Sequence, residues 1–78
     1  MDKRLERMRA NPQNDWTISD VEAICAAYGL ACKAPRGGGS HFGISHPQMT
    51  EILTVPSRRP IKPVYIRRLV KMIDALRA

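Results

Sequence analysis

The spacing of apolar residues predicts a helix in the first half of the chain. Apolar side chains recur there at the three- and four-residue intervals of one helix face: Val21, Ile24, Cys25 and Tyr28. Ser19 is expected to cap the start of this helix, with Glu22 completing a capping box. Gly29 supplies the left-handed residue that closes many helices. The pattern therefore predicts a helix over residues 19–28.

Beyond Gly29 the apolar residues fall at every second position, which is the period of a β-strand. Residues 30–34, 40–45 and 51–55 each fit one short strand, and the segments 36–39 and 46–50 fit turns. In the middle strand we expect Phe42 and Ile44 to face the core, which leaves His41 on the opposite face. Connections this short favour antiparallel pairing.

A second amphipathic helix is predicted over residues 63–77. Pro63 suits its first turn, where the missing N–H costs nothing. One face of this helix is apolar: Ile66, Leu69, Val70, Ile73 and Leu76. The sequence therefore predicts an α+β fold in the order α-β-β-β-α. Two helices would cover one face of a small three-stranded antiparallel sheet, as in double-stranded-RNA-binding domains.

The first part of the chain fits a short additional helix over residues 1–10. Only Leu5 and Met8 are available for it to bury, so we expect it to be weakly held. The expected organisation is an N-terminal segment over residues 1–15 and one domain over residues 16–78, because 78 residues leave no room for two domains.

Charge is distributed unevenly along the chain. The formal net charge is +6. Residues 1–31 carry four basic and five acidic residues, whereas residues 32–78 carry nine basic and two acidic ones. This asymmetry indicates a polyanionic partner for the second part of the chain. Charge alone does not separate RNA, DNA, an acidic protein and an anionic membrane.

Other features of the composition narrow the class of protein. The two cysteines, Cys25 and Cys32, are too few for a disulfide framework and lack the spacing of metal ligands, so we expect small buried side chains in a reducing compartment. The N-terminal residues lack the apolar run of a signal peptide. No apolar run approaches the ~20 residues of a membrane span. We expect a cytoplasmic protein with no metal, no cofactor and no membrane partner.

The stretch Gly37–His41 is the most informative for chemistry. A histidine on the open face of a sheet is free to titrate near neutral pH, and the N–H groups of a glycine-rich turn can bind phosphate. Basic residues lie on the neighbouring strand and in the loops expected nearby: Lys33, Arg36, Arg58, Arg59 and Lys62. Together with Gly39 and Ser40, this pattern suits a phosphodiester. On spacing alone, however, a surface histidine beside a hairpin turn is the simpler interpretation.

The order of these features resembles the HicA family. The similar features are a helix closed by glycine, a basic strand, the sequence Gly39-Ser40-His41 opening a second strand, and a third strand that ends at Pro56. Ile61-Lys62-Pro63 then leads into the last helix, and the resemblance spans roughly residues 16–77. It implies a toxin that cleaves mRNA, is neutralised by a cognate HicB antitoxin and uses His41 as its catalytic histidine.

On this interpretation the 2′-OH of RNA attacks its adjacent phosphate. His41 is expected to act as general base or general acid, and Lys33, Arg36 or Arg58 to stabilise the added negative charge. His46 is five residues away, which is ~16 Å along a regular strand and on the opposite face. We therefore expect His46 to be a turn residue.

Several questions stay open at the level of sequence. A non-catalytic RNA-binding module, or a small DNA-binding or protein-interaction subunit, would carry the same basic residues. The polar face of the last helix, with Arg67, Arg68 and Lys71, fits phosphate contacts, a solvated face or a docking surface for an antitoxin. Tyr65 fits a platform for base stacking or a cap on the core, and Trp16 is expected to fill the core.

Overall fold

A computed structural model describes residues 3–78 and shows a small α+β fold, which confirms the predicted fold class. Its elements are α1 (Lys3–Ala10), α2 (Ile18–Tyr28), β1 (Ala31–Lys33), β2 (His41–Ser45), β3 (Leu53–Pro56) and α3 (Pro63–Arg77). The predicted bounds of the last helix are confirmed. The first two residues of the predicted N-terminal helix lie outside the described residues.

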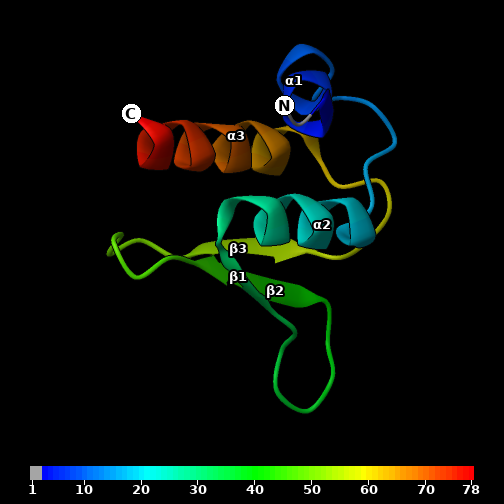
Figure 1. Ribbon diagram of the computed structural model, residues 1–78. Coiled ribbons are helices and arrows are strands. Elements are labelled where there is room, and N and C mark those ends of the chain that lie inside the picture. The colour runs from blue at the N-terminus through cyan, green and yellow to red at the C-terminus, as the bar shows by residue number, and fades with distance from the viewer. Residues whose placement is uncertain (1–2) are drawn as a thin grey trace.

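The three strands form an antiparallel sheet in the order β1-β2-β3. In the central strand β2, Gly43 lies opposite Lys33 of β1 on one side and Thr54 of β3 on the other. At the start of β2, His41 lies opposite Pro56. Helices α2 and α3 lie on the same side of the sheet, and α1 packs against α3 (Figure 1). The other face of the sheet is left uncovered by helices.

The core lies between the helices and the sheet. Ile24 of α2, Ile44 of β2 and Ile66 of α3 are each fully buried in one cluster. Phe42 lies on the same face as Ile44, as predicted, because its cross-strand partner Val55 is buried in the core. Phe42 itself is only half-buried and is not part of the fully buried cluster. Alternation predicts the face on which a side chain lies, but not how completely the side chain is buried.

The predicted start of α2 is also wrong in detail. Thr17, not Ser19, is the N-cap, and Asp20, not Glu22, completes the capping box. The Thr17 hydroxyl accepts a hydrogen bond from the Asp20 N–H (3.3 Å), and the Asp20 carboxylate accepts one from the Thr17 N–H (3.0 Å). The observed pair Thr17–Asp20 and the predicted pair Ser19–Glu22 both have the three-residue spacing of a capping box. Burial of Trp16 immediately before Thr17 fixes the helix start at the earlier position.

Trp16 fills the core as predicted, and it also connects distant segments. Its ring is 6% exposed, and its indole N–H donates a hydrogen bond to the Asn11 carbonyl (2.8 Å). The Trp16 carbonyl accepts one from the N–H of Ile61, just before α3 (2.8 Å). At the other end of α2, Gly29 adopts the predicted left-handed conformation (φ 76°).

Helix α1 belongs to the same core as the rest of the fold. Leu5 and Met8, the two residues from which we expected only weak attachment, are both fully buried in the common cluster. On the surface, the Arg9 guanidinium forms two hydrogen bonds with the Asp74 carboxylate of α3. Among residues 3–78, no helix combines the length and apolar character that crossing a bilayer requires.

Candidate functional site

His41 occupies the position predicted for it, at the start of β2 on the open face of the sheet. Ile44, three residues along the strand, is buried beneath the helices, so alternation directs His41 to the opposite face, where it is exposed. Its ring Nδ1 lies 3.5 Å from the Ser40 hydroxyl oxygen. The imidazole is therefore accessible to a ligand.

Lys33 lies on the same face as His41. It is the cross-strand partner of Gly43, two residues along β2 from His41. Such diagonal neighbours are typically ~7–8 Å apart between Cα atoms, within reach of a lysine side chain. Gly43 has no side chain, and a Cβ placed there would lie 3.9 Å from the methyl group of Ile52. Gly43 therefore places no side chain between His41 and Lys33.

The turn before His41 depends on its glycines. Gly37, Gly38 and Gly39 have φ angles of 77°, 85° and 127°, a region that other residues rarely adopt. Arg36 is exposed at the start of this turn. The Ser40 carbonyl accepts a hydrogen bond from the Ser57 N–H (2.5 Å), which joins the end of the turn to the residue after β3.

The segment after β3 supplies a second wall of the site. A hollow of about 360 Å³ is lined by Pro56, Arg58, Arg59, Pro60, Lys62 and Tyr65. One of the lining residues, Pro56, is the cross-strand partner of His41, although His41 itself does not line the hollow. The structure thus brings three of the predicted cations, Arg58, Arg59 and Lys62, together around one hollow. Tyr65 is half-buried against the core, which is one of its two predicted roles, and it also lines the hollow.

The cations of the site differ in their partners. Arg59 is paired with Asp15, whose two carboxylate oxygens each lie 3.0 Å from the Arg59 Nε. This hydrogen-bonded pairing holds the pKa of the Asp15 carboxyl below its usual value. Within residues 3–78, no carboxylate lies at ion-pair distance from the other four predicted cations: Lys33, Arg36, Arg58 and Lys62. Arg59 therefore contributes little net charge to this surface.

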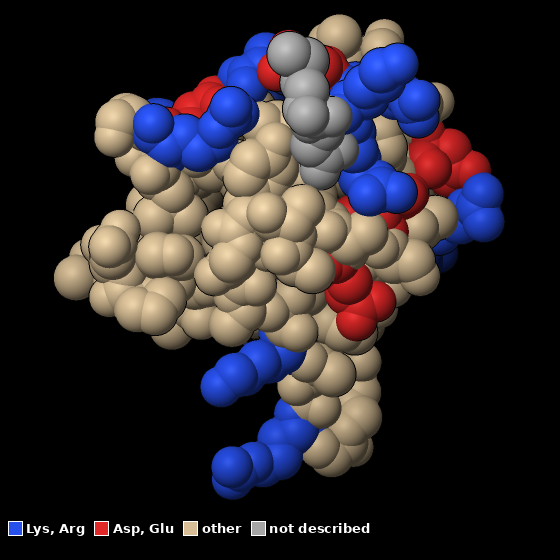
Figure 2. Space-filling model, in the orientation of Figure 1, with Lys and Arg blue, Asp and Glu red and all other residues tan. Residues whose placement is uncertain are grey.

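The distribution of charge is visible on the surface (Figure 2). Around α1 the basic and acidic side chains are interleaved, whereas basic side chains without acidic neighbours project at the end of the molecule where Figure 1 shows the loop between β1 and β2. The basic residues of that stretch are Lys33 and Arg36. Part of the unpaired positive charge thus lies on the loop that leads into His41.

His46 is a turn residue, as predicted. Its ring Nδ1 accepts a hydrogen bond from the Gln48 N–H (3.0 Å), and its carbonyl accepts one from the Met49 N–H (3.0 Å). It follows the last residue of β2, whereas His41 is the first. The two histidines therefore do not form an acid–base pair.

The described part of the chain supplies neither a reactive thiol nor a metal-ligand cluster. Burial raises the pKa of the Cys25 thiol to about 12, and it raises the pKa of the half-buried Cys32 as well. Both thiols are therefore protonated and unreactive at neutral pH. No group of three or more His, Cys, Asp or Glu side chains in residues 3–78 is placed to hold a metal ion.

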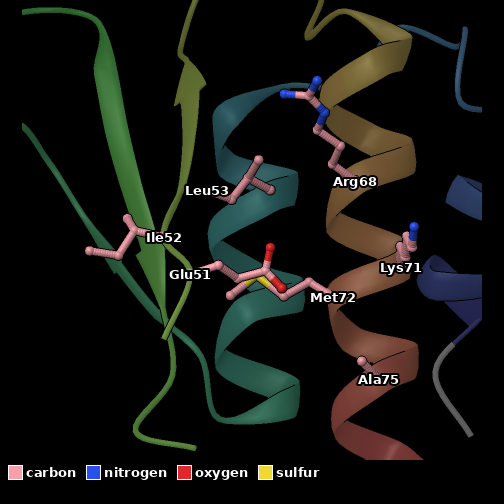
Figure 3. A pocket seen from close by; sticks show the side chains of 7 residues that line it. All are labelled: Glu51, Ile52, Leu53, Arg68, Lys71, Met72 and Ala75. Carbon is pink, nitrogen blue, oxygen red and sulfur yellow. The ribbon is translucent and has the colours of Figure 1, made fainter. Parts of the chain in front are cut away.

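A second hollow, of about 430 Å³, lies between the start of β3 and α3 (Figure 3). It is lined by Glu51, Ile52, Leu53, Arg68, Lys71, Met72 and Ala75. In Figure 3 the Glu51 side chain extends toward Met72, while Ile52 points away from α3. This hollow adjoins the Leu53 end of β3, and the hollow beside His41 adjoins the Pro56 end. Arg68 and Lys71 thus belong to a different surface from the predicted site.

No protein family, no curated protein and no solved structure matches this chain. The resemblance to the HicA family, and to the layout of double-stranded-RNA-binding domains, therefore rests on the residues of this chain and remains a prediction.

Proposed function

We propose that this protein is an endoribonuclease that cleaves mRNA, with His41 as its catalytic histidine. The observation that carries the proposal is the position of His41, exposed on an open sheet face between two loops that carry unpaired cations. A polyanion drawn to these cations meets an accessible imidazole, the side chain best suited to proton transfer near neutral pH.

The reaction follows from these groups. The 2′-oxygen of a ribose attacks the adjacent phosphorus, the bond from phosphorus to the 5′-oxygen breaks, and the products are a 2′,3′-cyclic phosphate and a 5′-hydroxyl. His41 either removes the proton from the 2′-OH or protonates the leaving 5′-oxygen, and water handles the other proton. General catalysis of this kind contributes roughly 10²–10⁴-fold.

The cations act on the phosphate itself. The attack gives the phosphorus five oxygen neighbours and increases the negative charge on the oxygens that do not react. Lys33, Arg36 and Arg58 are exposed and unpaired, and they lie on β1, in the turn before β2 and in the segment after β3, the three segments that flank His41. Cations fixed where charge develops lower the barrier to reaction. Gly39 and Ser40 would hold the phosphate through the backbone next to His41.

The proposed biological role is that of a toxin paired with an inhibitor. An mRNA-cleaving enzyme is harmful in the cytoplasm unless it is held inactive. A HicB-like antitoxin that covers the open sheet face would block His41 and neutralise the unpaired cations. No helix of the described chain covers this face, so the whole site is accessible to such a protein.

The alternative is a non-catalytic RNA-binding module. One observation favours it: His41 has no second histidine beside it, because His46 is held in a turn at the other end of β2. A binding module would use the same basic surface, and its His41 would only contact RNA.

Induced expression in a bacterial host separates the two functions. We expect the wild-type chain to arrest growth and degrade total RNA on a gel, while a folded His41→Ala variant does neither. Lys71→Ala is the matched control, because it removes a charge from the separate surface on α3 and should remain toxic. Equal toxicity of the wild type and His41→Ala, or no RNA degradation by either, would favour the binding module.

A further inference from the structure

The walls of the hollow beside His41 have a composition of their own. Pro56, Pro60 and Tyr65 present apolar, largely flat surfaces, and Arg58 and Lys62 add positive charge to the same space. Its volume of about 360 Å³ lies within the range of small-ligand pockets, ~300–1,000 Å³. A flat apolar ligand that carries negative charge would match both properties.

The hollow is held in shape without a ligand. Ile61, between the lining residues Pro60 and Lys62, is 1% exposed, and its N–H donates to the Trp16 carbonyl (2.8 Å). Arg59 is held by Asp15, and the prolines have fixed φ angles. A preformed site loses less conformational freedom on binding than a flexible one. These contacts therefore favour a binding site over a loop that happens to be concave.

We propose that this hollow binds one unpaired nucleobase of the RNA strand, next to the phosphate that is cleaved. The identity of the ligand as RNA rests on the proposed function. The base stacks on the Tyr65 ring and the proline surfaces, as bases do in proteins that bind single strands. Arg58 and Lys62 contact the phosphates on either side of that base. An acidic peptide would satisfy the cations but would leave the flat walls without a planar partner.

Pro56 links the hollow to the catalytic histidine. Pro56 lines the hollow and is the cross-strand partner of His41, so a strand whose base occupies the hollow carries its adjoining phosphodiester toward the imidazole. The hollow thereby positions the phosphate that reacts.

A consequence is selection for single-stranded RNA. A base within a duplex is stacked and paired, so it does not enter the hollow without being unpaired first. Domains that bind duplex RNA recognise its shape across the grooves and need no base pocket. Although the sequence predicts a layout like those domains, the hollow indicates a different mode of recognition here.

The test is equilibrium binding by fluorescence anisotropy, with wild-type protein and 2′-O-methyl oligonucleotides, which lack the attacking hydroxyl. We expect the single strand to bind more tightly than a hairpin duplex of equal length. Tyr65→Leu should weaken single-strand binding by about 5- to 150-fold, which corresponds to the loss of one stacked base. Tyr65→Phe, which retains the ring, should bind within about 2-fold of the wild type. Binding of the duplex should change little in either variant.

A second readout requires no variant and therefore does not depend on how well Tyr65→Leu folds. A 2-aminopurine base moved along the single strand should be quenched at one position when wild-type protein binds. Equal affinity for single strand and duplex, together with no quenched position, would overturn the proposed base site. Because these strands cannot be cleaved, that result would leave His41-dependent cleavage standing, and failure of cleavage would leave the base site standing.

Discussion

Two segments border His41, and they are built in opposite ways. Residues 34–40 lead into the histidine through three glycines, and a Cβ added at Gly37 or Gly38 would meet nothing within 4 Å. Residues 57–62 follow the cross-strand partner of His41 and are fixed to the body of the protein by buried Ile61 and by the Arg59–Asp15 pair. Both segments carry cations, but only the second has its shape fixed by packing.

The two segments are therefore suited to different tasks. The segment over residues 57–62 is a preformed wall, and on the proposed function it would bind RNA with little rearrangement. The glycine turn is shaped by its backbone conformation rather than by side-chain contacts, so it can adjust around a phosphate. A preformed wall favours precise placement of a substrate, whereas an adjustable glycine turn allows the backbone to approach an anion closely.

The largest effect should come from removing the anchor of the preformed wall. Ile61→Ala should lower the free energy of unfolding by about 2–5 kcal/mol, because it empties a fully buried site. Urea denaturation measures this loss. Ile52→Ala is the control: Ile52 is 67% exposed, and its loss should cost within about 0.5 kcal/mol. Similar effects of the two variants would show that residues 57–62 are not held by packing.

A smaller effect is expected in the glycine turn. Gly38→Ala should cost about 1–2 kcal/mol, because its φ of 85° is unfavourable for a residue with a Cβ even where space is open. Gly38→Asn should lose less, since asparagine adopts left-handed conformations more readily. Thermal unfolding of the two variants compares them, and a neutral Gly38→Ala would mean that the turn does not require this conformation.

The next prediction concerns Arg58 and the Arg59–Asp15 pair. Substitutions there should change the salt dependence of RNA binding in opposite directions. Arg58→Ala should reduce the slope of log affinity against log salt by about 1, as the loss of one phosphate contact does. Asp15→Asn should increase the slope by about 1, because it frees Arg59 to contact RNA. A salt titration of binding measures both, with Lys71→Ala as the control that leaves the slope unchanged. Changes of the same sign would contradict the assigned pairing of Arg59.

The smallest effect concerns the Arg59–Asp15 pair itself. Hydrogen bonding to Arg59 lowers the pKa of the Asp15 carboxyl, so the pair stabilises the fold above the usual aspartate pKa. This stabilisation is lost as the pH falls through the lowered pKa. Titration of the Asp15 carboxyl by NMR should give a midpoint below the usual aspartate value, and Arg59→Ala should return it toward that value. An unshifted midpoint in the wild type would show that the pair does not form in solution.

Local periodicity was sufficient to predict much of the fold and the position of His41. The last helix, the Gly29 cap and the three strands follow from spacing between neighbouring residues, and the exposed face of β2 follows from Ile44. The start of α2 was missed because Ser19 and Thr17 both fit a capping pattern. Only the burial of Trp16 distinguishes them.

The partners of individual charges could not be predicted in this way. Arg59 pairs with Asp15, 44 residues away, and Arg9 with Asp74, 65 residues away. Such pairs depend on which distant segments the fold brings together, and the spacing of neighbouring residues carries no information about that. Thus Arg59 had the same sequence signal as Arg58, although only Arg59 is held in an ion pair. The hollow formed around Tyr65 likewise appears only once α3 and the segment after β3 are in place.

The most direct test of the central claim is cleavage of a labelled single-stranded RNA by the purified protein. We expect the wild type to cut it, a single 2′-deoxy substitution to abolish the cut at that position alone, and a folded His41→Ala variant to be slower by roughly 10²–10⁴-fold. Equal rates for the wild type and His41→Ala, or cutting at the 2′-deoxy position, would contradict the assignment of His41 as the catalyst of 2′-OH attack.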